Sequence, residues 1–274
     1  MTRQLPIPFC ADMVRALMTC AKCGRLSPTA VCACGSTEFR KTMTRRAIRG
    51  LSSEWTLGIT PQQYRPGSFA FFDMADPVGT YPTCFRCPYQ PGDELWVRET
   101  WRIGAWDEDE GTVAVDYKAD GYSRREWLQC PDPDTFQRLW IQSTDDARVA
   151  GVLPDAEGRY HWEPGQAPTR WRPSMFMPKL FARNWLKVLD VRPPERVQEI
   201  SEEDAIAEGI EYHEGVHRWR SYNIRSQTPF LCATASHSYQ TLWDSLNSKK
   251  HPWSSNPWLW PYRFQRIDAP AAKE

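Results

Sequence analysis

Four cysteines near the start of the chain form the strongest chemical motif in the sequence. Cys20 and Cys23 make a C-x-x-C knuckle, Cys32 and Cys34 make a C-x-C knuckle, and a glycine follows each knuckle directly. Four thiolates spaced in this way can surround one metal ion tetrahedrally, as in structural zinc sites. The spacing predicts one structural zinc ion within a module of residues 20–39, with no coordination position left open for catalysis. The alternative is a loop of four unligated cysteines.

The other cysteines carry weaker signals. Cys84 and Cys87 could supply a replacement metal ligand, form a redox pair, or lie in a turn before Pro88, and we favour the turn. The chain shows no export signal, so we expect reduced thiols in the cytoplasm. The isolated cysteines are expected to be small buried hydrophobic residues: Cys10, Cys130 and Cys232.

A basic stretch, RKTMTRR, occupies residues 40–46. Neighbouring cations disfavour a charged ammonium group and would lower the pKa of Lys41, so that its amine could accept a proton. The hydroxyl of Thr44 could attack an acyl carbon if such a base lay within reach. The alternative is a solvated basic face, or a phosphate-contact patch that includes Arg45 and Arg46.

Residues 94–101 (ELWVRETW) have the composition of a strand. Alternation along this strand turns the carboxylate of Glu99 toward the apolar face together with Trp101. We expect Glu99 to orient a substrate from a position behind the reacting groups. The alternative is an ion pair between Glu99 and Arg45 or Arg46.

The chain contains 14 tryptophans and 23 prolines, many of them adjacent. Trp101, Trp171 and the Pro-Trp cluster at 252–260 could stack on a flat heterocycle, although most tryptophans are expected in the core. Arg172 and residues 175–178 are expected to line or support the mouth of a pocket.

Composition excludes several classes of protein. The 274 residues are 41% hydrophobic and 25% charged, which is ordinary globular usage and unlike a disordered or coiled-coil chain. Lys plus Arg number 34 and Asp plus Glu number 34, so no overall field attracts nucleic acid or a membrane surface. No apolar run reaches the length of about 18 residues that a spanning helix needs.

Periodicity and turn signals predict the remaining elements. Residues 118–172 lack a sustained period, and we interpret them as a long irregular insertion. We expect the strand at 258–267 to be an edge strand or to contain a bulge, because it includes Pro261. The other predicted elements are helices at 9–19 and 202–208, a helical apolar stripe at Tyr239, Leu242, Trp243 and Leu246, and strands at 68–73, 112–117 and 181–191.

Short strands without regular strand–helix alternation predict an α+β domain built on a small, mixed, barrel-like sheet. Several sequence blocks then occur in a recognisable order: KTMTRR, PGDELWVRETW, WRPSMFMP, ISEEDAIAEGI, LWDSLN and NPWLW. In this order they resemble phage and prophage proteins of the ASCH family. That resemblance implies a PUA-like mixed β-barrel with short flanking helices. The domain would comprise residues 1–19 and 40–274, with the zinc-knuckle module inserted at 20–39. A second, long insertion would occupy residues 118–170.

The resemblance also implies a class of ligand. ASCH and related PUA-like domains are associated with RNA, modified nucleobases and nucleosides, and some small bacterial members are amidohydrolases that act on N4-acetylcytidine. Lys41 and Thr44 match the lysine and threonine of that motif, with Arg46 in the place of its arginine. Aligning the helix that begins at Ser201 puts Glu208 on the motif's glutamate. The resemblance thus implies that Lys41, Thr44 and Glu208 converge on one catalytic pocket.

These observations leave three hypotheses. The first is an enzyme that binds a modified nucleoside and hydrolyses an acyl-amide on it, with Arg45, Arg46, Glu99, Trp101 and Arg172 around the substrate. The second is a module that binds nucleic acid or a modified base without catalysis, in which the basic residues contact phosphate and the aromatic residues stack on bases. The third is a phage protein that acts through a host or phage protein partner. None of the three involves a membrane.

Overall fold

A computed structural model describes residues 2–58, 68–73, 83–120, 126–222 and 231–270. The chain divides into two compact units, and we describe each by itself. Unit 1 comprises residues 1–5, 16–95 and 185–274, and unit 2 comprises residues 6–15 and 96–184. The division falls within three elements: strand β1 (Gln4–Pro8), helix α1 (Ala11–Met18) and strand β6 (Glu94–Arg98).

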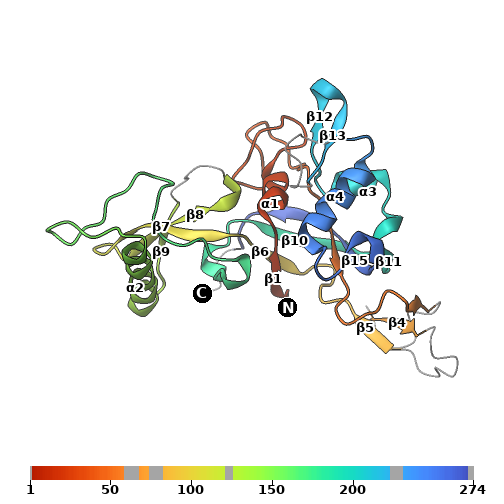
Figure 1. Ribbon diagram of the computed structural model, residues 1–274, viewed down its shortest axis with the longest axis horizontal. Helices are drawn as coiled ribbons and strands as arrows, with labels where there is room; N and C mark the ends of the chain where they lie inside the picture. Colours follow the sequence, from red (N-terminus) through yellow and green to blue (C-terminus); the bar gives the residue numbers. More distant parts are fainter. Residues whose placement is uncertain (1, 59–67, 74–82, 121–125, 223–230, 271–274) are drawn as a thin grey trace. The chain divides into compact units, whose positions relative to one another are not determined.

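Unit 1 consists mostly of strands (Figure 1). Its main sheet is curled and has the order β1-β6-β10-β15-β11, with β2 also paired to β15. Two three-stranded sheets, β3-β4-β5 and β12-β13-β14, accompany it. The elements wholly within this unit are β2 (Met43–Ala47), β3 (Thr56–Leu57), β4 (Ser68–Phe72), β5 (Thr83–Arg86), β10 (Trp185–Val191), β11 (Glu195–Arg196), α3 (Glu202–Ala207), β12 (Tyr212–His213), β13 (Arg218–Arg220), β14 (Leu231–Cys232), α4 (Ala235–Asn247) and β15 (Trp258–Ile267).

Strand β15 is the centre of the main sheet, so the expectation of an edge strand is wrong. Strand β15 pairs antiparallel with β10, β11 and β2. A bulge does occur in its pairing with β10, but it lies in β10 between Val188 and Asp190.

The pairing with β10 ends at Val191 and the pairing with β11 begins at Glu195, so Pro261 lies opposite the gap between them. A proline in a central strand normally removes one ladder hydrogen bond. The missing N–H would point to the same side of β15 as the Pro261 carbonyl, which accepts from the Arg192 amide at 3.1 Å in the gap between β10 and β11. On the other side of β15, Pro261 pairs in register with Arg45 of β2.

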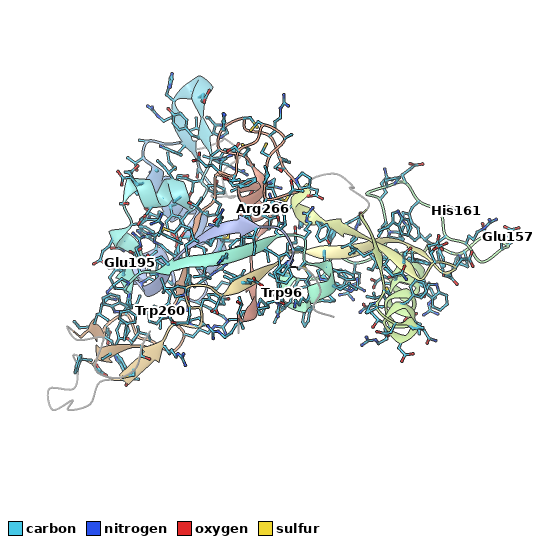
Figure 2. The ribbon with its side chains drawn as sticks, turned by 180° about the vertical axis from the view of Figure 1, so that it is seen from behind. Trp96, Glu157, His161, Glu195, Trp260 and Arg266 are labelled. Atoms are coloured by element: carbon cyan, nitrogen blue, oxygen red, sulfur yellow. The ribbon has the colours of Figure 1, made fainter. Side chains whose placement is uncertain are left out.

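The two faces of β2 and β15 have different coverings. On one face, Leu259 packs into a core with helix α4, which lies beside α3 (Figure 1). On the other face, Trp260 and Tyr262 pack with Phe71 in an aromatic cluster. Figure 2 labels Trp260 on this strand. Because side chains alternate along a strand, neighbouring residues in β2 point to opposite faces and contact different clusters.

Unit 2 contains an antiparallel sheet of β7 (Trp101–Asp107), β8 (Thr112–Tyr117) and β9 (Glu126–Gln129), with α2 (Pro133–Val149) beside it (Figure 1). The expectation of an irregular stretch over 118–172 is therefore wrong for α2 and β9, while residues 121–125 lie outside the described part. Helix α2 has an ordinary cap, because the carboxylate of Asp132 accepts from the Thr135 amide at 2.7 Å and Pro133 occupies the first turn. A loop carrying Glu157 and His161 follows the helix (Figure 2).

Most other predicted elements are confirmed, with small shifts at their ends. The predicted helices at 9–19 and 202–208 are α1 and α3, the apolar stripe lies on α4, and the predicted strands at 68–73, 112–117 and 181–191 are β4, β8 and β10. The predicted strand 94–101 is instead divided into β6 and the start of β7. The architecture is α+β, as expected. Within the described ranges, no helix is both long enough and apolar enough to span a bilayer.

Candidate functional site

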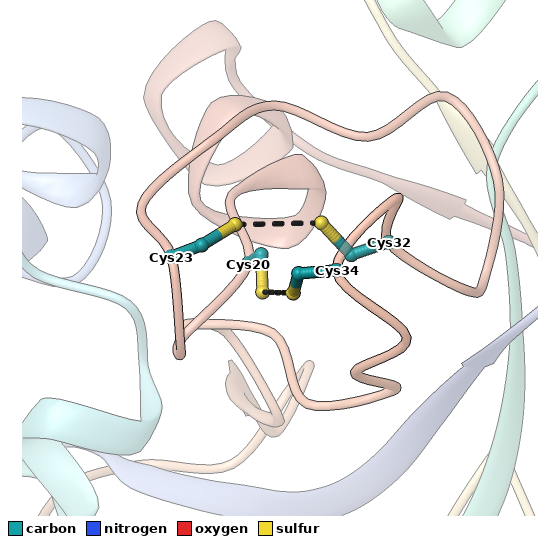
Figure 3. Close-up of side chains that lie close together, drawn as sticks. All are labelled: Cys20, Cys23, Cys32 and Cys34. Carbon is teal, nitrogen blue, oxygen red and sulfur yellow. Dashed lines mark hydrogen bonds between the residues drawn. The ribbon is translucent and has the colours of Figure 1, made fainter.

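The four knuckle cysteines converge at one point, as predicted (Figure 3). Their sulfur atoms all lie within 4.8 Å of one another, with Cys20 and Cys34 3.7 Å apart and Cys23 and Cys32 3.5 Å apart. Four sulfurs each about 2.3 Å from one zinc ion would be about 3.8 Å apart. The backbone amide of Cys23 lowers the pKa of the Cys20 thiol to about 6, whereas burial and the neighbouring thiols raise that of Cys32 to about 11 in the absence of a metal. The cluster could therefore hold one metal ion.

The loop between the knuckles is attached to the end of β15. The guanidinium of Arg266, labelled in Figure 2, donates to the carbonyl oxygens of Ser27 and Pro28, both at 2.8 Å. The amide of Ala30 donates to the carboxylate of Asp268 at 3.0 Å. A metal bound by the cysteines would therefore order a loop that contacts the central strand of unit 1.

The second cysteine pair does not lie in a turn, which corrects that expectation. Cys84 is an exposed residue of strand β5, and Cys87, which follows the strand, is buried with its sulfur 3.5 Å from the hydroxyl of Tyr262. Burial raises the pKa of the Cys87 thiol. Within the described residues, neither cysteine joins a group of potential metal ligands.

Lys41 and Glu208 form an ion pair although 167 positions separate them. The Lys41 ammonium donates to a carboxylate oxygen of Glu208 at 2.7 Å and to the Glu208 carbonyl oxygen at 2.8 Å. Both side chains are fully buried. Two of the three residues proposed to act together are thus in direct contact.

The end of helix α3 places Glu208 beside Lys41. Ser201 caps the start of the helix by accepting from the Asp204 amide, and the chain leaves the helix at Gly209 with φ of 84°. A β-carbon at position 209 would lie 2.7 Å from the β-carbon of Ala16 and 2.9 Å from that of Lys41. Only glycine fits both this backbone conformation and this close approach. The glycine therefore allows the helix end to meet residue 41 directly.

Arg45 extends the ion pair into a network. Its guanidinium contacts Glu208 at 3.3 Å, Asp204 at 2.6 Å and Glu195 at 2.5 Å, and Arg192 also contacts Asp204 at 2.5 Å. The network thus contains three cations, counting Lys41, and three carboxylates. The Lys41 nitrogen thus has a carboxylate partner at 2.7 Å, which the expectation based on the neighbouring arginines alone did not include.

Thr44 and Arg46 lie on the opposite face of strand β2. Arg45 donates to the sulfur of Met43 on the face that contacts Glu208. Thr44 pairs in register with Tyr262 and Arg46 with Trp260, whose side chains belong to the aromatic cluster on the other face. The Thr44 hydroxyl is buried and has no hydrogen-bond partner within the described residues. The structure therefore does not bring Thr44 to the Lys41–Glu208 pair.

Glu99 is buried, as alternation predicts, but its partner is not Arg45 or Arg46. Arg183 binds both carboxylate oxygens of Glu99, at 2.9 and 2.8 Å, and also contacts Asp120 at 2.8 Å. Burial raises the pKa of Glu99 in spite of the hydrogen bonds from Arg183. All of these residues belong to unit 2. Glu99 is therefore part of a buried ion-pair group with Arg183 and Asp120.

Trp101 and Arg172 line a cavity of about 850 Å³ in unit 2. Their backbones form a bridge with hydrogen bonds in both directions, at 3.2 and 2.7 Å, and the Arg172 guanidinium lies 5.6 Å from the centre of a Trp101 ring. Trp171 and Phe176 also line the cavity, and both are partly or largely exposed. These four lining residues were all predicted from the sequence to contact a ligand or to lie at the mouth of a pocket: Trp101, Trp171, Arg172 and Phe176.

Sequence reasoning missed the wall of this cavity that helix α2 supplies. Arg138, Leu139 and Asp146 of this helix line the cavity. The local signal was present, since an aspartate precedes a proline at 132–133 and apolar residues recur at Phe136, Leu139 and Trp140. The many proline and aspartate residues around this segment made the helical spacing hard to recognise, so no helix was predicted there.

Acidification should weaken the Arg45 network through Asp204. Burial alone would raise the pKa of Asp204, but the Arg192 hydrogen bond and the Arg45 charge lower it below 3.8. The ionised carboxylate therefore stabilises the folded state above that pH, and this contribution is lost as the pH falls through the lowered pKa. We expect Asp204→Asn to lose less unfolding free energy than the parent between about pH 5 and pH 2.5, measured by urea denaturation. Glu203→Gln changes an exposed neighbour and should show the same pH dependence of unfolding free energy as the parent. If Asp204→Asn also shows the pH dependence of the parent, the assignment to Asp204 is wrong.

No family model, curated protein or solved structure matches this chain.

Proposed function

We propose that this protein binds a nucleobase or nucleoside in the cavity of unit 2. The observation that carries the proposal is the presence of Trp101, Trp171 and Arg172 on one cavity of about 850 Å³. A volume in the range of roughly 300–1,000 Å³ suits a small-molecule ligand. Trp171 and Phe176 are exposed and offer stacking surfaces that any base can use, Arg172 adds a cation beside them, and the buried Trp101 supports the wall.

The resemblance to phage and prophage ASCH proteins supports the same class of ligand. The matching sequence blocks include WRPSMFMP, which contributes Trp171, Arg172 and Phe176 to the cavity. The curled sheet of unit 1 is compatible with a PUA-like barrel, and that finer identity is part of this proposal. We also propose that the metal held by the four cysteines is zinc, because a closed set of four thiolates is its usual structural site.

Hydrolysis of an acyl-amide is the second candidate function, and it depends on the contact between Lys41 and Glu208. With Thr44 on the other face of β2, the reaction would use a water molecule that enters when the direct Lys41–Glu208 contact opens. Glu208 would take a proton from this water as its oxygen bonds to the acyl carbon, the C–N bond would break, and the Lys41 ammonium would give a proton to the departing nitrogen. Because both side chains are fully buried, a substrate would reach them only after local opening. Incubation with a panel of N-acylated nucleosides and mass spectrometry of the products tests this reaction. Turnover that persists in Lys41→Met would exclude it.

Binding itself is tested by substituting a stacking residue. Trp171 is 39% exposed on the cavity, and stacking on a base is worth about 1–3 kcal/mol. Trp171→Ala should therefore weaken nucleoside binding by roughly 5- to 150-fold in isothermal titration calorimetry. Trp127→Ala is the matched control, because Trp127 is 47% exposed and does not line the cavity. Equal losses in the two variants, or none in Trp171→Ala, would contradict this binding site.

A further inference from the structure

The charges around the unit 2 cavity are unequal. Three of its lining residues are arginines, at positions 138, 170 and 172, and one is a carboxylate, Asp146. The Asp146 carboxylate is already paired with the Arg172 guanidinium at 2.7 Å and also accepts from the Arg170 amide at 3.1 Å. After this pairing, the guanidinium groups of Arg138 and Arg170 remain as an excess of positive charge on the wall.

The two remaining arginines differ in what they contact. Arg138 donates to uncharged atoms of its own helix, the Thr135 hydroxyl at 3.1 Å and the Asp134 carbonyl oxygen at 3.4 Å, and its charge also helps to lower the pKa of the neighbouring Asp132 carboxylate. The exposed side chain of Arg170 has no ion pair with a carboxylate within the described residues. A guanidinium group offers several N–H donors in a plane that matches a phosphate. These two positions are therefore available to an oxyanion.

Trp101 provides a second, independent observation. Its side chain is 2% exposed, and its indole N–H is buried with no hydrogen-bond partner within the described residues. A buried donor without an acceptor is costly, and such a group in a native structure calls for an explanation. Trp101 lines the cavity, but its indole nitrogen has almost no accessible surface, so a ligand oxygen would accept from it only after a small shift of the cavity wall. The wall of the cavity thus contains one donor without an acceptor, beside an excess of positively charged side chains.

We propose that the ligand is a nucleotide, with its phosphate at Arg138 and Arg170, its base against Trp171, and an oxygen atom accepting from the Trp101 indole. This inference rests on the proposed function and narrows it from a neutral nucleoside to a phosphorylated one. A mononucleotide and a phosphodiester unit of single-stranded nucleic acid share this chemistry.

The test compares matched ligands on the full chain by isothermal titration calorimetry. The ligands are the four ribonucleosides, their 5′-monophosphates, inorganic phosphate and a short single-stranded oligonucleotide. We expect at least one monophosphate to bind about tenfold or more tightly than its nucleoside, with weaker binding at higher salt. If the oligonucleotide binds more tightly than the mononucleotide, nucleic acid is identified as the source of the phosphate.

Arg138→Gln/Arg170→Gln should remove most of the preference for the monophosphate over the nucleoside. Arg148→Gln is the control, because Arg148 is an exposed α2 residue that does not line the cavity. The assigned Trp101 indole resonance should also shift on titration with the monophosphate. If a nucleoside and its monophosphate bind equally, the inference is wrong and the proposed function stands. If neither binds, both are wrong.

Discussion

Lys41→Met should lower the free energy of unfolding by about 3–5 kcal/mol, the cost of breaking a buried ion pair by removing one partner. The loss should be large because both side chains of the Lys41–Glu208 pair are fully buried and the ammonium also holds the Glu208 carbonyl oxygen. Urea denaturation monitored by tryptophan fluorescence measures the change. A stability effect of this size would identify the pair as a structural link between the end of α3 and the segment before β2.

Two further variants make this test specific. Lys187→Met makes the same substitution at an exposed position of β10 and should change stability by less than about 0.5 kcal/mol. The double variant Lys41→Met/Glu208→Leu should recover part of the loss, because replacing both charges leaves neither buried alone. If Lys41→Met unfolds like the parent and loses turnover of an acylated nucleoside, the lysine has a catalytic role instead.

The second large effect concerns the four knuckle cysteines. Protein purified without added metal should contain about one equivalent of zinc, and Cys20→Ser/Cys23→Ser should contain almost none. Because metal binding supplies much of the folding free energy of such modules, residues 20–39 should also become sensitive to protease in the variant. Elemental analysis and limited proteolysis measure the two outcomes.

Cys84→Ser is the matched control for this metal site. Cys84 is exposed on β5 and lies outside the cluster, so the variant should keep its metal. Full metal content in the Cys20→Ser/Cys23→Ser variant would exclude this ligand set. Two equivalents in the parent would point to a second site that involves Cys84 and Cys87.

Elements whose signals are local were predictable from the sequence. Helix α3 begins at a serine cap and ends at a glycine with positive φ, and both signals lie within nine residues of the chain. The cysteine cluster is equally local, since a short loop brings two knuckles together. Strand β15 was predicted with the correct bounds, but its central place in the sheet depends on three distant partners that no local pattern specifies.

The candidate sites follow the same distinction. The contact between Lys41 and Glu208 was expected only from a family resemblance, because 167 positions separate the two residues. The separation of Thr44 from this pair follows from strand alternation and could be derived once β2 was known to include residues 43–47. The partner of Glu99 could not be derived, since many arginines in the sequence could have filled that role and packing selects Arg183.

The central position of β15 has a consequence for the synthesis of the protein. Strand β2 leaves the ribosome early, yet its partner residues in β15 follow roughly 210 positions later. At about 5–20 residues per second, β2 would wait at least about ten seconds for its neighbour. During that interval its hydrogen-bonding edge and the apolar residues of β10 have no central strand to cover them. Ribosome-bound chains that stop before residue 258 should therefore recruit chaperones more strongly than chains that include β15.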